Sequence, residues 1–205
     1  MRLGLLVTSA LAVSLVVVSI ERTSAQDARK GTSKEAVELL RETAMGGECV
    51  IEMDGDGGIV ALEAGVPLSA VPQVCRDAAD KHVPGGKATG AEKEWAGGKH
   101  YWEVIKEVDG VRYEILMNPD GSLAGKESAL KADAAPAAVV ESAKKAVGGG
   151  ELVVCEEVSG PEAAYGEDYH VKLRVEGEVL RVSVKKDGTV VRTLRKMKAE
   201  VRVPK

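Results

Sequence analysis

The residues with the widest chemical range in this 205-residue chain are three histidines and three cysteines: His82, His100, His170, Cys49, Cys75 and Cys155. A metal site needs ligands at characteristic spacings, such as His-x-x-x-His or Cys-x-x-Cys, and the sequence contains neither. A reactive thiol needs exposure and a cationic neighbour, whereas Cys75 and Cys155 fall at apolar positions of a predicted helix and a predicted strand. No Gly-x-Ser-x-Gly motif is present to hold a nucleophilic serine. We therefore predict that the protein is not an enzyme and has no catalytic residues, no cofactor and no metal ligands.

Acidic runs are the next candidates for chemistry. The run from Asp54 to Gly58 starts like a calcium loop, but an EF-hand loop beginning there needs a carboxylate at its twelfth position, where Gly65 stands. A hairpin turn is the better interpretation. Glu92 to Glu94 and Glu156-Glu157 are interpreted as solvated faces of strands, and the histidines as structural or surface residues.

The remaining candidates lie on one predicted strand, His100–Val108. Side chains alternate between the two faces of a strand, so Trp102 is expected beneath a helix, with Tyr101, Glu103 and Ile105 on the opposite face. An aromatic and an aliphatic side chain on an exposed face are typical of a binding patch. These three residues are the predicted partner-binding face. The alternative is that Tyr101 packs against the second half of the chain or a loop.

The elements that would position these residues recur along the chain. Two predicted helices begin at Pro72 and Pro136, 64 positions apart, and each is followed by glycines. Further on, Asp109-Gly110 matches Glu176-Gly177 at an offset of 67 positions, between runs of alternating apolar residues. Such dipeptides between alternating runs indicate β-hairpins.

We therefore predict an α+β fold of two tandem units, each a helix packed on one face of a roughly four-stranded antiparallel sheet, with a truncated helix–hairpin before them. The predicted strands are 49–53, 59–63, 87–95, 100–108, 111–117, 122–127, 151–158, 169–175, 178–185 and 189–196. The predicted parts of the chain are a truncated helix plus hairpin at 34–65 (its helix at 34–45), the first unit at 66–128 and the second at 129–205.

These motifs carry a family resemblance. The run from Tyr101 to Val104, the Asp109-Gly110 turn, Tyr113-Glu114-Ile115 and the run from Asp120 to Leu123 resemble the PepSY-like, beta-lactamase-inhibitor-like domains of secreted bacterial proteins. The resemblance covers about residues 66–196. It implies protein binding rather than catalysis, as in protease propeptides and secreted inhibitors, and it brings no catalytic residues with it.

The start of the chain predicts export. Arg2 is followed by an uncharged apolar stretch from Leu3 to Ile20 and by Thr23-Ser24-Ala25, so residues 1–25 are a predicted signal peptide and 26–33 a disordered leader. A membrane would be involved only through this segment, if it stayed uncleaved. Outside the cytoplasm, the odd number of cysteines permits at most one internal disulfide, and the sequence leaves open whether any pair forms.

The charge balance excludes one class of partner. The chain has 28 Lys and Arg against 32 Asp and Glu, so no basic excess exists to meet a phosphate backbone, and we predict no nucleic-acid partner. The leading hypothesis is a secreted or periplasmic, non-enzymatic module that binds a protein or peptide through its open sheet face, with peptidase inhibition as one form. The alternative is an extracytoplasmic sensor or ion-binding protein that uses acidic sheet faces.

Overall fold

The structure is a computed structural model, and it describes residues 49–161 and 166–199. The predicted signal peptide, leader and first helix, residues 1–45, lie outside the described residues. The described residues form these elements: β1 Cys49–Met53, β2 Ile59–Gly65, η2 Leu68–Ala70, α2 Gln73–His82, β3 Lys87–Ala96, β4 Lys99–Val108, β5 Val111–Met117, β6 Leu123–Ala129, α3 Ala137–Val147, β7 Glu151–Ser159, β8 Tyr169–Val175, β9 Glu178–Val184 and β10 Val190–Ala199.

The positions of the elements confirm the strand and helix predictions. Every predicted strand is present, with ends within three residues of the predicted ones, and the two helices begin directly after Pro72 and Pro136. The turns between β4 and β5 and between β8 and β9 have a positive φ at Asp109 and Glu176 and at the glycine after each. Two successive residues of this kind form the tight turn whose twist matches that of the flanking strands.

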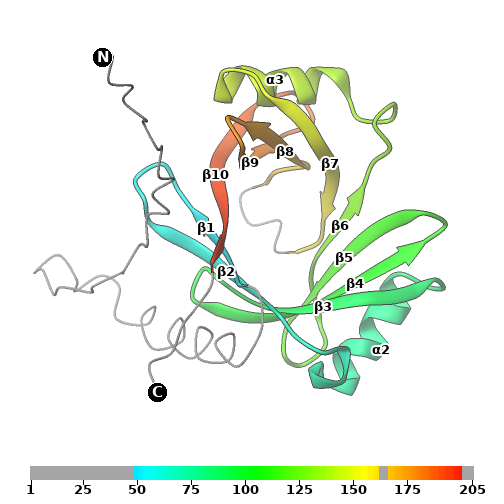
Figure 1. The fold of residues 1–205 in the computed structure, drawn as a ribbon. Helices are drawn as coiled ribbons and strands as arrows, with labels where there is room; N and C mark the ends of the chain where they lie inside the picture. The colour runs from blue at the N-terminus through cyan, green and yellow to red at the C-terminus, as the bar shows by residue number, and fades with distance from the viewer. Residues whose placement is uncertain (1–48, 162–165, 200–205) are drawn as a thin grey trace, which may run out of the picture. The chain divides into compact units, whose positions relative to one another are not determined.

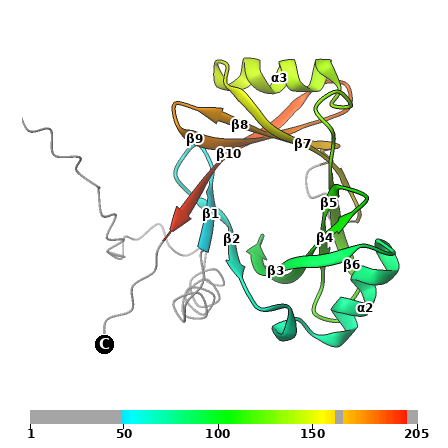
Figure 2. The same cartoon turned by 45° about the vertical axis from the view of Figure 1, so that its right-hand side comes forward.

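The sheet topology overturns the predicted fold class. All ten strands form one closed antiparallel barrel in the order β1-β10-β9-β8-β7-β6-β5-β4-β3-β2 (Figures 1 and 2). Strand β6 pairs directly with β7, and the β1–β2 hairpin joins β3 to β10. The prediction of two tandem units with separate sheets is therefore wrong. An open sheet from β3 to β10 would leave two rows of unpaired backbone groups, and the hairpin covers both of these edges.

Both helices pack against the outside of the barrel (Figure 2). Helix α2 contacts β4 and β5, and α3 contacts β8, β9 and β10. Beneath α2, Cys75 packs with Val104 and Ile115, and beneath α3, Val139 packs with Val171 and other apolar residues. The apolar faces of β3 to β5 thus form a core with α2, and those of β7 to β9 form a core with α3. A third cluster, without either helix, contains Cys49, Leu62, Ala64 and Trp95.

This arrangement fixes the surroundings of the predicted binding face. The predicted register of β4 is confirmed, because Trp102 and Val104 lie on the helix side. The expectation of a solvated opposite face is wrong, because closure of the sheet turns that face inward. Tyr101, Glu103 and Ile105 are only 6%, 8% and 7% exposed.

Candidate functional site

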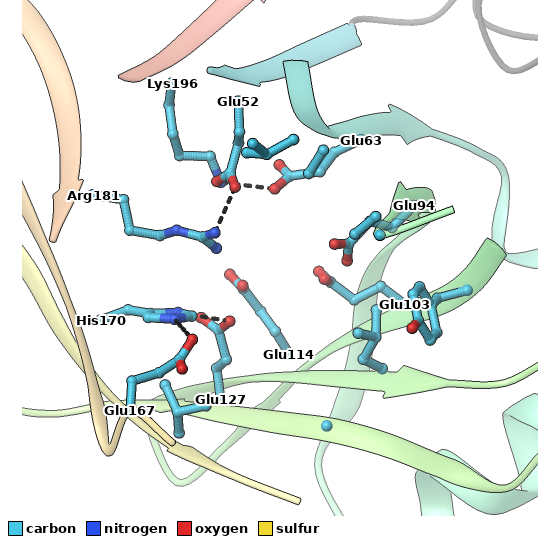
Figure 3. Close-up of a pocket in the computed structure, with 18 of the residues that line it drawn as sticks. Glu52, Glu63, Glu94, Glu103, Glu114, Glu127, Glu167, His170, Arg181 and Lys196 are labelled. Atoms are coloured by element: carbon cyan, nitrogen blue, oxygen red, sulfur yellow. Dashed lines mark hydrogen bonds and ion pairs between the residues drawn. The ribbon is translucent and has the colours of Figure 1, made fainter. Parts of the chain in front are cut away.

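The inside of the barrel holds a cavity of about 290 Å³ whose walls are rich in charge (Figure 3). Side chains alternate along each strand of such a barrel, so every second residue faces inward. The charged residues that line the cavity are Glu52, Glu63, Glu94, Glu103, Glu114, Glu127, Glu167, Lys99, Lys126, Lys172, Lys196, Arg181, Arg192 and His170.

One side of the cavity, formed by β8, β9 and β10, carries cations that are paired with carboxylates. A guanidinium nitrogen of Arg181 lies 2.5 Å from a carboxylate oxygen of Glu52, and the Lys196 ammonium lies 3.2 Å from Glu52 and 3.0 Å from Glu63. Burial alone would raise the pKa of Glu52, but Arg181 and Lys196 outweigh it and hold that pKa below its ordinary value. Burial opposes the charge of Arg181, but Glu52 and the other carboxylates of the cavity outweigh it and raise the pKa of Arg181.

His170 on β8 is held between two carboxylates. Its Nδ1 lies 2.9 Å from Glu127 and its Nε2 lies 3.3 Å from Glu167. Burial opposes a charge on the ring, but the nearby carboxylates outweigh it and raise the pKa of His170. In turn, His170 holds the pKa of Glu127 well below its ordinary value and helps to lower that of Glu167 to about 2. These pKa shifts indicate that His170 is an imidazolium with a carboxylate on each side.

The same region contains the one group of residues with metal-ligand geometry among those the structure describes. Ligand atoms of Glu127, Glu156 and His170 all lie within 4.8 Å of one another. All three are already engaged, because His170 contacts carboxylates through both nitrogens and the Lys172 ammonium lies 2.8 Å from Glu156. A metal ion would have to displace a proton and compete with an ammonium, so we interpret this group as an ion-pair network.

The opposite side, formed by β2 to β6, is acidic. Glutamates face one another directly across neighbouring strands in three pairs: Glu63 and Glu94, Glu92 and Glu103, and Glu114 and Glu127. Like charges in directly opposed positions destabilise a sheet. We call this side, with Glu92, Glu94, Glu103 and Glu114 as its members, the acidic wall.

Glu94 and Glu103 are the members of the acidic wall that line the cavity without an ion pair to a described residue, although Arg181 attracts the Glu94 carboxylate electrostatically. Both point into the cavity (Figure 3), and neither makes a hydrogen bond or ion pair with any residue that the structure describes. Glu103 is only 8% exposed. Burial, followed by the neighbouring carboxylates, raises the pKa of both residues well above the ordinary value.

The other sequence predictions have the following outcomes. The Asp54–Gly58 run forms a hairpin turn, as predicted, and the Asp54 carboxylate accepts hydrogen bonds from the backbone N–H groups of Asp56 and Gly58 at 3.1 and 2.7 Å. Cys75 and Cys155 lie in the two outer cores, as predicted, and all three cysteines are buried. The interpretation of the acidic runs as solvated faces is wrong for Glu94, which lines the cavity, and for Glu156, which is buried.

Sequence reasoning identified Glu103 but missed the residues that surround it. Glu94, Glu63 and Arg181 occupy the non-apolar positions of alternating strands, which were assigned to solvent. One signal was available, since Glu103 and Glu114 become His170 and Arg181 at the offset of 67 positions. Opposite charges at matching positions of the two repeats indicate that the polar faces of the two repeats lie opposite each other.

In the described part of the chain, these features define a class of protein: a closed antiparallel barrel with helices α2 and α3 outside and a charged cavity within. No family model matches the sequence, and a search of curated proteins finds no significant match.

Among solved structures, a protein of Bacteroides eggerthii provisionally described as periplasmic is 18% identical, with a TM-score of 0.47 over 61% of this chain and 88% of the other. A DUF2874 family protein of Bacteroides uniformis is 16% identical, with a TM-score of 0.46 over 60% and 88% of the two chains. A BLIP-like protein of Bacteroides fragilis is 17% identical, with a TM-score of 0.45 over 63% and 87%.

Within the described part of the chain, no helix is both long and apolar enough to cross a membrane. The predicted binding of a protein or peptide stays a prediction, and so does the PepSY-like assignment. Function has to be inferred from the residues of the cavity.

Proposed function

We propose that this protein is a non-enzymatic binding protein that holds a small cationic ligand inside its barrel. The observation that carries the proposal is Glu103, a carboxylate that is buried, aimed into the cavity and without a partner among the described residues. Glu94 on the neighbouring strand also lines the cavity without an ion pair to a described residue, and it is half-buried. The proposal extends the hypothesis of an ion-binding protein with acidic sheet faces, with those faces turned inward.

The energetics of burial support a cation as the ligand. A buried charge raises the free energy of a protein unless a partner compensates it. The pKa values of Glu94 and Glu103 are raised for this reason, so both groups ionise less readily than an exposed glutamate. A cation in the cavity would remove this penalty and would form charge-assisted hydrogen bonds or ion pairs with both groups. Binding of the cation is therefore favoured because it makes the ionisation of these two carboxyl groups less unfavourable.

The same two carboxylates support binding rather than catalysis. In a site for acid–base catalysis, neighbouring carboxyl groups have different surroundings that push their pKa values apart, so that one donates a proton and the other accepts it. Here burial raises the pKa of both groups in the same direction. The pair therefore has the character of a joint binding site for positive charge.

The proposal can be tested by measuring thermal stability against a panel of cations: Na⁺, Ca²⁺, Zn²⁺ and short alkylammonium compounds at neutral pH. A ligand that binds only the folded protein raises the melting temperature in a concentration-dependent way. We expect at least one cation to do so, and we expect Glu103→Gln to abolish the response.

Glu107→Gln is the matched control, because Glu107 is on the same strand and exposed to solvent. It should respond like the wild type. A flat response to every cation would overturn the proposal, as would a response that Glu103→Gln leaves unchanged.

A further inference from the structure

We infer that the ligand is a short organic diammonium compound, whose ammonium groups pair with Glu94 and Glu103 and whose carbon chain packs on Tyr101 and Leu116. This inference rests on the proposed function and names the chemical class of its ligand. It follows from what lies beside each carboxylate, from the number of uncompensated charges and from the size of the cavity.

Each of the two carboxylates has an apolar or aromatic neighbour on the next strand. Tyr101 lies directly opposite Glu94, and Leu116 lies directly opposite Glu103. Side chains in directly opposed positions have Cβ atoms about 4.5–5.5 Å apart, which is close enough to contact one ligand together. All four residues line the cavity, as do Val60 and Ala61. The site therefore offers negative charge next to apolar surface.

This combination suits an alkylammonium group better than a metal ion. A hard divalent cation takes six or more oxygen ligands, and Leu116 has no side-chain oxygen to contribute. Within the described residues, the acidic wall brings no three ligand atoms within 4.8 Å of one another, and the one group that does so lies on the other side of the cavity. An ammonium group donates to the carboxylates while its methylene groups cover the apolar residues, and the Tyr101 ring can attract it electrostatically.

The charge count indicates two ammonium groups rather than one. Two carboxylates that line the cavity form no ion pair with a described residue. They lie on neighbouring strands in diagonal positions, because Glu94 is opposite Tyr101 and Glu103 is two residues further on. Diagonal neighbours are about 7–8 Å apart, a distance that a short carbon chain with an ammonium at each end can span. The volume of about 290 Å³ is at the small end for ligand pockets and limits the length of that chain.

Isothermal titration calorimetry of the full-length protein can test this inference with four probes: putrescine, butylamine, 1,4-butanediol and Ca²⁺. We expect putrescine to bind, butylamine to bind about tenfold or more weakly because one carboxylate stays uncompensated, and 1,4-butanediol not to bind. Glu94→Gln and Glu103→Gln should each reduce the affinity for putrescine to about that of butylamine. Circular dichroism would verify that both variants are folded, and Glu107→Gln should bind putrescine like the wild type.

A third variant tests the apolar part of the site. Leu116→Asn should weaken putrescine binding several-fold, since it replaces an apolar contact with a polar group, and it should leave the preference for two charges over one intact. If Ca²⁺ or another metal ion binds in a Glu103-dependent manner and putrescine does not, the inference is wrong and the proposed function stands. If no cation binds, both are wrong. Equal affinities for putrescine and butylamine would overturn the assignment of two charges.

Discussion

The inner faces of β4 and β5 differ in charge from those of β8 and β9, although the two regions occupy matching positions in the chain. Glu103 and Glu114 line the first region, and His170 and Arg181 stand 67 positions later in the second. On the second side, His170 and Arg181 each have a carboxylate partner. On the first side, Glu103 has none among the described residues.

The difference separates two roles for buried charge. The ion pairs of β8 to β10 connect strands that are not directly paired. Arg181 on β9 reaches past β10 to Glu52 on β1, and His170 on β8 reaches past β7 to Glu127 on β6. Such pairs specify which strands lie together. The acidic wall instead holds carboxylates in excess of the available cations. We interpret the paired side as structural and the acidic wall as the side that faces a ligand.

The largest effect is expected from breaking the paired side. Arg181→Ala leaves Glu52 buried beside Lys196 alone, and removing one partner of a buried ion pair costs about 3–5 kcal/mol of unfolding free energy. Urea denaturation at neutral pH would measure this loss. Arg195→Ala is the control, because the Arg195–Glu178 pair is about half exposed and should contribute no more than about 1 kcal/mol. Equal small losses for the two variants would mean that the paired side does not stabilise the barrel.

A smaller effect of opposite sign is expected on the acidic wall. Without ligand, Glu94→Gln and Glu103→Gln should each raise the unfolding free energy at neutral pH by more than the roughly 0.5 kcal/mol of a surface substitution, because each removes a group whose ionisation folding makes unfavourable. Glu107→Gln should change it by less than about 0.5 kcal/mol. Destabilisation by both inner variants would show that these carboxylates support the fold, and the comparison of the two sides would fail.

The most gradual effect is a dependence of stability on pH. Folding raises the pKa of these carboxyl groups, so above about pH 4.5 they ionise in the unfolded chain but still hold their protons in the folded protein. Ionisation then favours the unfolded chain, and stability is lost as the pH rises through the folded-state pKa. The groups that face Glu103 are Glu92 and Glu94 from β3, Glu114 from β5 and Glu63 from β2, and all are acidic. The unfolding free energy should therefore fall as the pH rises above the ordinary carboxyl value of about 4.5.

The double variant Glu94→Gln/Glu103→Gln should show a flatter profile over the same range. Folding also raises the pKa of His170, so the stabilisation that its imidazolium provides is lost as the pH rises above the ordinary value of 6.5. This decrease in unfolding free energy is the same in both proteins. The carboxylates with lowered pKa values lose their stabilisation only at lower pH, as Glu167 does on approaching about 2. Profiles of equal slope would show that folding does not raise the pKa values of Glu94 and Glu103.

Local features were predictable from the sequence, and the closure of the sheet was not. Alternation over Val111–Met117 and the Asp109-Gly110 turn specify a hairpin through neighbouring residues alone, and both were predicted correctly. The pairing of β1 with β10 and of β6 with β7 joins strands without a short turn between them, so it has no local signature. An alternating strand also has the same pattern whether its polar face meets water or a polar cavity. Glu103 was therefore placed on the correct face but in the wrong surroundings.

The pairing of β1 with β10 brings Cys49 beside Ala199, near opposite ends of the described chain. Contacts between residues so far apart in sequence form slowly, because the long intervening segment must first be brought into place. Until they form, the strands from β3 to β10 present two free edges on which other chains could assemble. The cavity cannot exist before that last pairing, so the ability to bind a ligand should emerge in the final, slowest step of folding.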